Sequence, residues 1–191
     1  MRAFLALCLA LGISVVVGSE APRAAITLAD LGLRDHHDQP WPAAASPGKV
    51  TLVSFGYTSC PDVCPLTLQV IAAALRALGD QAAEVLPLFI SVDPARDQPQ
   101  RLKDYVGYFD PRIIGLSGDA GAIVAVTARF GAVYALGASK ADGPYTVDHS
   151  VDLFVLDATG TLVARVPFGL PAEHIAQLVR PLLKPDRTLA R

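Results

Sequence analysis

Two cysteines in the first half of the chain have the spacing of a reactive dithiol. Cys60 and Cys64 enclose Pro61, Asp62 and Val63. On a helical turn, positions four apart lie on one face, so the two sulfurs can reach each other or a shared metal ion. A helix N-terminus favours the thiolate, which is both the nucleophile and the metal ligand. The pair can therefore form a disulfide, exchange with one, or bind a soft ion such as Cu(I).

His149 is the candidate for a third ligand, because it lies in the segment VDHS just before a predicted strand. Two thiolates and an imidazole form a three-coordinate site that accepts Cu(I) and also Cu(II). The same donors with an open position also suit zinc. A histidine taken alone is more often a hydrogen-bonded core or loop residue, so a position beside the dithiol is what favours a ligand role.

Other polar residues admit two interpretations each. Asp62 and Asp93 are possible second-shell groups that orient metal ligands, while helix capping and turn formation explain them equally well. The segment 35–38 (DHHD) resembles a metal-binding cluster, but neighbouring residues of an extended segment point in opposite directions. We therefore favour a turn there, with an accessory metal site as the alternative. His174 lies among polar residues of the last predicted helix and is expected at the surface.

Strands that alternate with helices must position these residues. The predicted strands cover residues 50–55, 85–92, 112–116, 151–156 and 162–166, and the predicted helices cover 65–78, 99–109, 120–130 and 171–183.

Two further segments are predicted as a short strand or turn over 28–33 and a loop over 137–147. The last two strands follow one another through a tight turn and form a hairpin. This order predicts an α/β, thioredoxin-like three-layer domain with a mixed central sheet. Cys60 and Cys64 then lie where a strand turns into a helix. His149 takes the neighbourhood in which thioredoxins hold a cis-proline against the dithiol.

The N-terminus predicts export. Arg2 precedes an apolar stretch over 3–18 that is followed by small and polar residues, as in a signal peptide. A membrane-spanning helix usually needs about 20 apolar residues, yet an uncleaved N-terminal anchor stays open as the alternative. Cys8 lies inside this stretch and receives no role. We expect the folded part in the periplasm, or anchored on the extracytoplasmic side of a membrane, where thiols can oxidise.

The remaining chain is expected to contain a lead-in segment over 19–49 and a single domain over 50–185. A formal net charge of -2 and a pI near 6.0 provide no basic surface for a phosphate backbone, which argues against nucleic acid as a partner. In an exported protein, a purely structural disulfide between Cys60 and Cys64 is the simplest alternative to a chemical role.

Three blocks of this sequence together resemble the signature of the Sco/SenC family. They are residues 56–65 (GYTSCPDVCP), 91–97 (SVDPARD) and 147–150 (VDHS), in that order along the chain. The resemblance runs from about residue 50 to 183. It implies a thioredoxin fold and one copper ion bound by Cys60, Cys64 and His149. It also implies a role in assembling the CuA centre of cytochrome c oxidase.

The resemblance implies several partners: the copper-bearing subunit of the oxidase, another copper carrier and a thioredoxin-like reductant. A CuA centre also uses two cysteines at this spacing, but it needs a second histidine and a methionine nearby. Met1 is the only methionine of the chain, which argues against an electron-transfer centre of either the CuA or the blue-copper type. The alternative function is a thiol-disulfide reductase that keeps the oxidase cysteines reduced. A peroxide-reducing relative would need a different cysteine signature.

Overall fold

The computed structural model describes residues 25–28, 30–42, 48–137 and 145–183. These residues form eight strands and four α-helices with two short 3₁₀ helices. The strands are β1 (Arg34–Asp35), β2 (Val50–Gly56), β3 (Val85–Ser91), β4 (Ile114–Ser117), β5 (Tyr134–Leu136), β6 (Val147–His149), β7 (Leu153–Leu156) and β8 (Leu162–Val166). The helices are α1 (Val63–Leu78), α2 (Pro99–Phe109), α3 (Ala120–Phe130) and α4 (Ala172–Val179), with 3₁₀ helices over Gly79–Glu84 and Arg180–Leu182.

Six strands form one mixed sheet in the order β1-β4-β3-β2-β7-β8. Strand β2 is parallel to β3, and β3 is parallel to β4, while β7 runs antiparallel to β2. The carboxyl ends of β2 and β3 therefore share one edge of the sheet with the amino end of β7. The loops that carry the dithiol, the Asp93 segment and His149 all meet at this edge.

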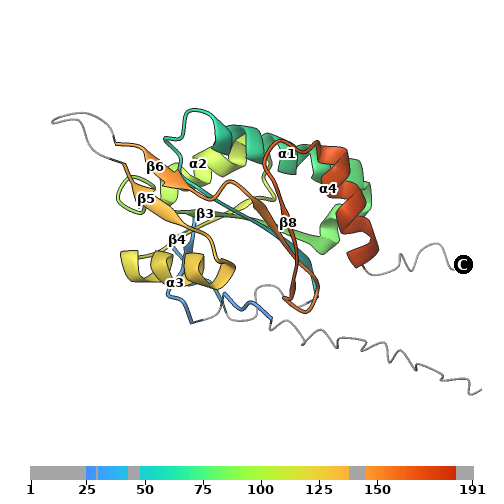
Figure 1. Cartoon of the computed structure of the whole chain (residues 1–191), viewed down its shortest axis with the longest axis horizontal. Helices are drawn as coiled ribbons and strands as arrows, with labels where there is room; N and C mark the ends of the chain where they lie inside the picture. Colours follow the sequence, from blue (N-terminus) through green and yellow to red (C-terminus); the bar gives the residue numbers. More distant parts are fainter. Residues whose placement is uncertain (1–24, 29, 43–47, 138–144, 184–191) are drawn as a thin grey trace, which may run out of the picture.

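Helices cover both faces of the sheet, which gives three layers (Figure 1). Helices α1, α2 and α4 lie together on one face, and α3 covers the other. Strands β2 and β3 are buried along their whole length, as expected for central strands with helices on both faces. Beneath α3, Phe130 packs edge-on against Phe55 of β2 and Phe154 of β7. The predicted thioredoxin-like, three-layer α/β architecture is confirmed.

The stretch Val63–Glu84, which is α1 with the 3₁₀ helix after it, is long and apolar enough to cross a membrane. Its apolar side faces the protein interior, because Leu68, Ile71 and Leu75 are fully buried. It is therefore a core helix that packs beside the sheet.

Two predicted helices have the observed bounds, and several strands differ. Helices α2 and α3 begin and end where the sequence predicts them. The predicted strand over 112–116 is observed over Ile114–Ser117, and that over 151–156 begins at Leu153. The predicted helix over 171–183 ends at Val179 and continues as a 3₁₀ turn, where Pro181 has no N–H to donate.

Three short strands, β1, β5 and β6, lie outside the predicted strands. Over 28–33, where the sequence predicts a short strand or a turn, the described residues contain a turn and no strand, and β1 follows at Arg34–Asp35 and pairs with β4. The predicted loop over 137–147 is bounded by β5 and β6, which pair antiparallel as a separate two-stranded sheet. His149 therefore ends a strand and lies opposite Tyr134, whereas the sequence predicted it just before a strand that begins at residue 151.

The described residues of the lead-in segment belong to the folded unit. Leu28, Leu31 and Leu33 are buried in the core. Ala25 forms a bridge with Thr161, and the Ile26 amide donates to the Gly160 carbonyl at 2.8 Å. These contacts place the start of the described chain at the β7–β8 turn. Because β7 is antiparallel to β2, this turn lies at the edge of the sheet opposite the dithiol. Residues 1–18, including Cys8, lie outside the described residues.

Candidate metal centre

The end of β2 places both cysteines. After Gly56 the chain makes a turn in which the Cys60 amide donates to the Tyr57 carbonyl at 3.2 Å. Cys60 precedes α1, and Cys64 lies in its first turn, so the strand-to-helix position predicted for the pair is confirmed. Both are free thiols; Cys60 is 9% exposed and Cys64 is 2% exposed. The site is thus nearly closed from the side of Cys64 and more open at Cys60.

Gly56 is required by the close approach of the Cys64 sulfur. A Cβ added at position 56 would lie 2.7 Å from Cys64 Sγ and 2.7 Å from an edge carbon of Phe89. Neither neighbour can move away freely, because both side chains are buried in the core. A residue without a side chain at the end of β2 is therefore what lets Cys64 sit against the sheet.

Strand β6 brings the imidazole of His149 to the dithiol. The ring Nε2 lies 3.3 Å from Cys64 Sγ, and Nδ1 lies 2.9 Å from the Ser150 carbonyl oxygen. A carbonyl can only accept, so Nδ1 carries the hydrogen and donates it. In the neutral ring Nε2 then has a free lone pair that faces the sulfur, which is the arrangement a metal-binding histidine needs.

Cys60, Cys64 and His149 form one cluster. Their ligand atoms all lie within 4.8 Å of one another, and within the described part of the chain no other group of three or more His, Cys, Asp or Glu residues converges in this way. Two sulfurs and one imidazole nitrogen form a soft donor set that fits a copper ion. The structure thus brings together the three side chains that the sequence proposes as metal ligands.

The protonation of Cys64 differs from the expectation for a helix N-terminus. Burial raises the pKa of the Cys64 thiol well above its ordinary value, and the neighbouring Cys60 raises it further. The cost of burying a charge outweighs the hydrogen bond from the Tyr57 backbone, which acts in the opposite direction. Cys64 is accordingly a thiol until a cation takes the place of its proton.

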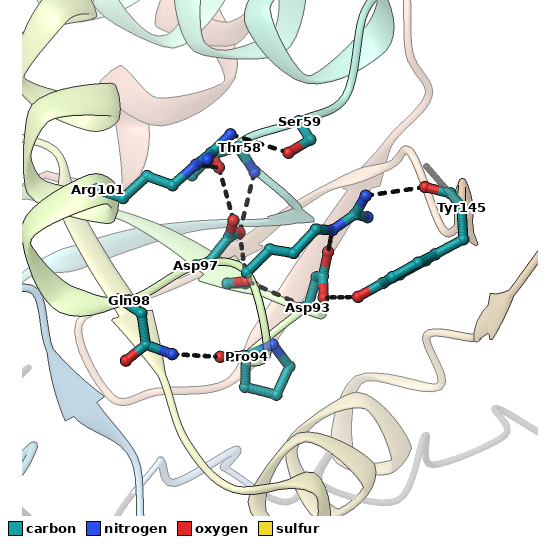
Figure 2. Close-up of polar contacts among 10 residues, drawn as sticks. Thr58, Ser59, Asp93, Pro94, Asp97, Gln98, Arg101 and Tyr145 are labelled. Carbon is teal, nitrogen blue, oxygen red and sulfur yellow. Dashed lines mark hydrogen bonds and ion pairs between the residues drawn. The ribbon is translucent and has the colours of Figure 1, made fainter. Parts of the chain in front are cut away.

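The two predicted second-shell aspartates have different surroundings. Asp62 is exposed at the N-cap of α1 and makes no capping hydrogen bond. Asp93 is buried after β3, where it accepts from the Tyr145 hydroxyl at 2.7 Å and is paired with Arg96 (Figure 2). The structure thus connects Asp93, but not Asp62, to the residues around the site.

Asp97 is a site residue that the sequence analysis missed. It is 1% exposed, and its carboxylate accepts from the Thr58 amide at 2.9 Å, the Thr58 hydroxyl at 2.6 Å and the Ser91 hydroxyl at 2.6 Å (Figure 2). Arg101 adds hydrogen bonds to the hydroxyls of Thr58 and Ser59. The turn that leads to Cys60 is therefore fixed to the β3–α2 loop. The only sequence feature that could have pointed to Asp97 is its place as the second aspartate of the segment 91–97.

The segment 35–38 has structural contacts. His36 Nδ1 accepts a hydrogen bond from the Gly115 amide at 2.9 Å, and Asp35 accepts from the amides of His37 and Gln39. The Asp35 bonds close the turn after β1, and the His36 bond fastens that turn to β4, the strand next to β1, in agreement with the turn that the sequence favoured. His174 is exposed on α4, as expected.

Comparison with known proteins agrees with this geometry. The family model described as SCO1/SenC matches residues 20–184. A SCO2-like protein of Rickettsia felis is 37% identical over 132 residues, which cover 69% of this chain and 64% of that protein. The mitochondrial SCO2 homolog of Bos taurus is 34% identical over 171 residues, 88% of this chain and 64% of the homolog. The chain thus spans under two thirds of the length of these curated relatives.

Solved structures show the same fold. The structure of Bradyrhizobium japonicum ScoI with copper bound has a TM-score of 0.74 and 36% identity, over 85% of this chain and 100% of that one. Yeast Sco1 with copper bound has a TM-score of 0.70 and 28% identity, over 83% of this chain and 91% of that one. With its fold, its cluster of two cysteines and a histidine, and a family match over most of its length, the chain belongs to the SCO1/SenC family.

Proposed function

We propose that this chain binds one copper ion through Cys60, Cys64 and Nε2 of His149 and helps deliver it to the CuA centre of cytochrome c oxidase. The observation that carries the proposal is the convergence of these three ligand atoms within 4.8 Å. The donor set is soft enough for Cu(I), and the imidazole lets it also accept Cu(II). Copper-bound structures of two similar proteins support the choice of copper over zinc.

The burial of the cysteines suggests how copper is held and released. Because burial raises the pKa of Cys64, copper binding displaces a proton from that thiol, and a proton returns when copper leaves. Cys60 is the more exposed of the two cysteines, so a partner's thiolate reaches the site from the Cys60 side. The partner's ligands then replace those of this chain one at a time, and no substrate is turned over.

The proposal includes export. Residues 1–18 act as a signal peptide or as a retained N-terminal anchor, and the domain works in the periplasm or on the extracytoplasmic side of a membrane. Its proposed partners are the copper-bearing subunit of the oxidase, another copper carrier that loads the site, and a thioredoxin-like reductant that keeps Cys60 and Cys64 reduced.

An anaerobic Cu(I) titration of the reduced full chain tests this function, with copper and free thiols counted. We expect one copper per chain, protection of both thiols, and clearly weaker binding by His149→Ala. The matched control is His174→Ala, which removes an exposed imidazole from α4 and is expected to bind as the wild type does. Absence of stoichiometric copper, or equal binding by the His149→Ala variant, would refute the three-ligand site.

The second candidate function is a thiol-disulfide reductase that keeps the oxidase cysteines reduced. The observation in its favour is that Cys60 and Cys64 are free thiols whose sulfur atoms lie within 4.8 Å of each other, close enough for a disulfide to form after a small movement. Two electrons and two protons would pass to the partner disulfide while Cys60 and Cys64 become a disulfide. Reduction of an oxidised CxxxC peptide that persists in His149→Ala, without copper binding by the wild type, would favour this function.

A further inference from the structure

Arg96 forms a closed set of contacts beside the metal centre. It lies in the loop between β3 and α2, where its Nε pairs with the buried carboxylate of Asp93. Its Nη1 donates to the Tyr145 carbonyl at 2.9 Å, and its guanidinium carbon lies 3.7 Å from the centre of the Tyr145 ring. Asp93 completes the set by accepting from the Tyr145 hydroxyl at 2.7 Å (Figure 2). Both the backbone and the side chain of Tyr145 are therefore held.

These contacts lead directly to His149. Tyr145 stands two residues before β6, the strand that carries the imidazole. The Arg96 guanidinium carbon also lies 5.3 Å from the centre of the Tyr57 ring. Tyr57 in turn meets the His149 ring edge-on, with 5.9 Å between the ring centres. Arg96 thus touches both aromatic residues that border the strand.

Stability alone is a poor reason for this arrangement. Asp93 is almost fully buried and the Arg96 side chain is 22% exposed, so forming the pair requires removing two charges from water. Arg96 Nη2 is buried and has no hydrogen-bond acceptor among the described residues, which adds a further cost. A role of Arg96 in the neighbouring metal centre would explain why a charged guanidinium is buried there despite these costs.

We propose that Arg96 is a positioning residue for His149: anchored by Asp93, it holds Tyr145 and Tyr57 against the strand that presents Nε2 to Cys64. The inference rests on the proposed copper-binding function, and it adds the residue that sets the third ligand. Arginine suits the task because its planar fork bonds a carboxylate and a carbonyl while its faces stack on aromatic rings. Without Arg96, the two cysteines would keep their places, and the imidazole would lose its fixed distance from them.

A double-mutant cycle on the full chain tests this role. Arg96→Gln is expected to weaken Cu(I) binding about 10-fold, the lower end of the effect usual for residues that orient metal ligands. In a His149→Ala background, the same substitution should change the affinity by less than about 2-fold, because the group that it positions is absent. Arg112→Gln is the matched control, since it breaks another partly exposed pair with an aspartate, Asp110, away from the site.

Equal losses in both backgrounds would mean that Arg96 acts on the whole fold, and no loss in either would mean that it has no role; both results overturn the proposal. A measurement without metal separates this proposal from the copper function. In the metal-free wild type, the ring ¹⁵N signals of His149 should show one tautomer with the proton on Nδ1, and Arg96→Gln should broaden or shift them. If the wild type binds no copper, the proposed function fails, and these ring signals alone decide the role of Arg96.

Discussion

The Sγ atom of Cys64 lies 3.3 Å from Nε2 of His149, although the two residues are 85 positions apart. Cys64 belongs to α1 and His149 to β6, so the pair exists only when these two elements are docked at the same edge of the sheet. A metal ion that bridges them therefore binds the folded chain far better than the unfolded one.

Copper is accordingly expected to stabilise the fold. Free Cu(I) at 100 times its dissociation constant should raise the free energy of unfolding by about 2.7 kcal/mol. Anaerobic thermal unfolding followed by circular dichroism measures this shift, and Cys64→Ser should lose most of it. An equal shift in wild type and Cys64→Ser would show that copper binds elsewhere.

Gly56→Ala should damage both the fold and the metal site. The added methyl would lie 2.7 Å from Cys64 Sγ and from Phe89, so the buried neighbours must shift, at a cost of about 1–3 kcal/mol. Gly107→Ala is the control, because it lies in α2 with nothing within 4 Å of the added carbon. It should instead stabilise the helix by about 0.5–1 kcal/mol. Urea denaturation measures both, and similar effects of the two substitutions would contradict the steric argument.

Asp97→Asn should loosen the turn that carries Cys60. The carboxylate accepts three hydrogen bonds from Thr58 and Ser91, and an amide presents an N–H₂ group to at least one of these donors. Leaving a buried donor unpaired costs about 1–3 kcal/mol, and we expect weaker copper binding as well. Asp104→Asn removes a charge from an exposed position of α2 and should change neither property. Urea denaturation and Cu(I) titration of the two variants decide between them.

The stability of the metal-free protein should fall as the pH decreases through the range in which His36 titrates. Burial lowers the pKa of His36, and the neighbouring His37 lowers it further. The unfolded chain, in which a histidine titrates near pH 6.5, therefore binds the proton more readily than the folded one. The contribution is fully present above about pH 6.5 and is lost below it, with a slope smaller than the limit of about 1.4 kcal/mol per pH unit for one proton.

The structural reason is the hydrogen bond from the Gly115 amide to His36 Nδ1, which protonation of that nitrogen removes. Free energies of unfolding measured in urea between pH 5 and 8 test this, since His36→Gln should flatten the dependence and His37→Gln, at an exposed position, should preserve it. A pH dependence that is unchanged in His36→Gln would assign the effect to another group.

The sequence predicted best those helices whose first and last residues are marked by local start and stop signals. Helix α2 begins at Pro99. Helix α3 begins after Asp119, whose side chain accepts a hydrogen bond from the Ala122 amide, and it is followed by Gly131 in the left-handed conformation. Such start and stop signals act within one turn, so they can be read from a single segment. The dithiol was found in the same way, because Cys60 and Cys64 are close together in the chain.

What could not be predicted depends on pairs of distant residues. Strands β5 and β6 are three residues each and pair with one another, without a hydrophobic alternation long enough to be read. The contact of Arg96 with Tyr145 joins residues 49 positions apart, and that of Asp97 with Thr58 joins residues 39 positions apart. No local sequence signal in either segment predicts that these side chains meet. They come together only because the folded sheet places their loops at one edge.

The bridge between Ala25 and Thr161 also determines how the domain would be presented to a large partner. If residues 1–18 stay in a membrane as proposed, the domain is attached to it at one edge of the sheet, and Cys60 and His149 lie at the opposite edge. The metal-binding edge then points away from the lipid surface by about the length of a strand of seven residues, roughly 23 Å. An oxidase subunit whose copper site stands at a similar height above the same membrane could be reached without detaching the donor.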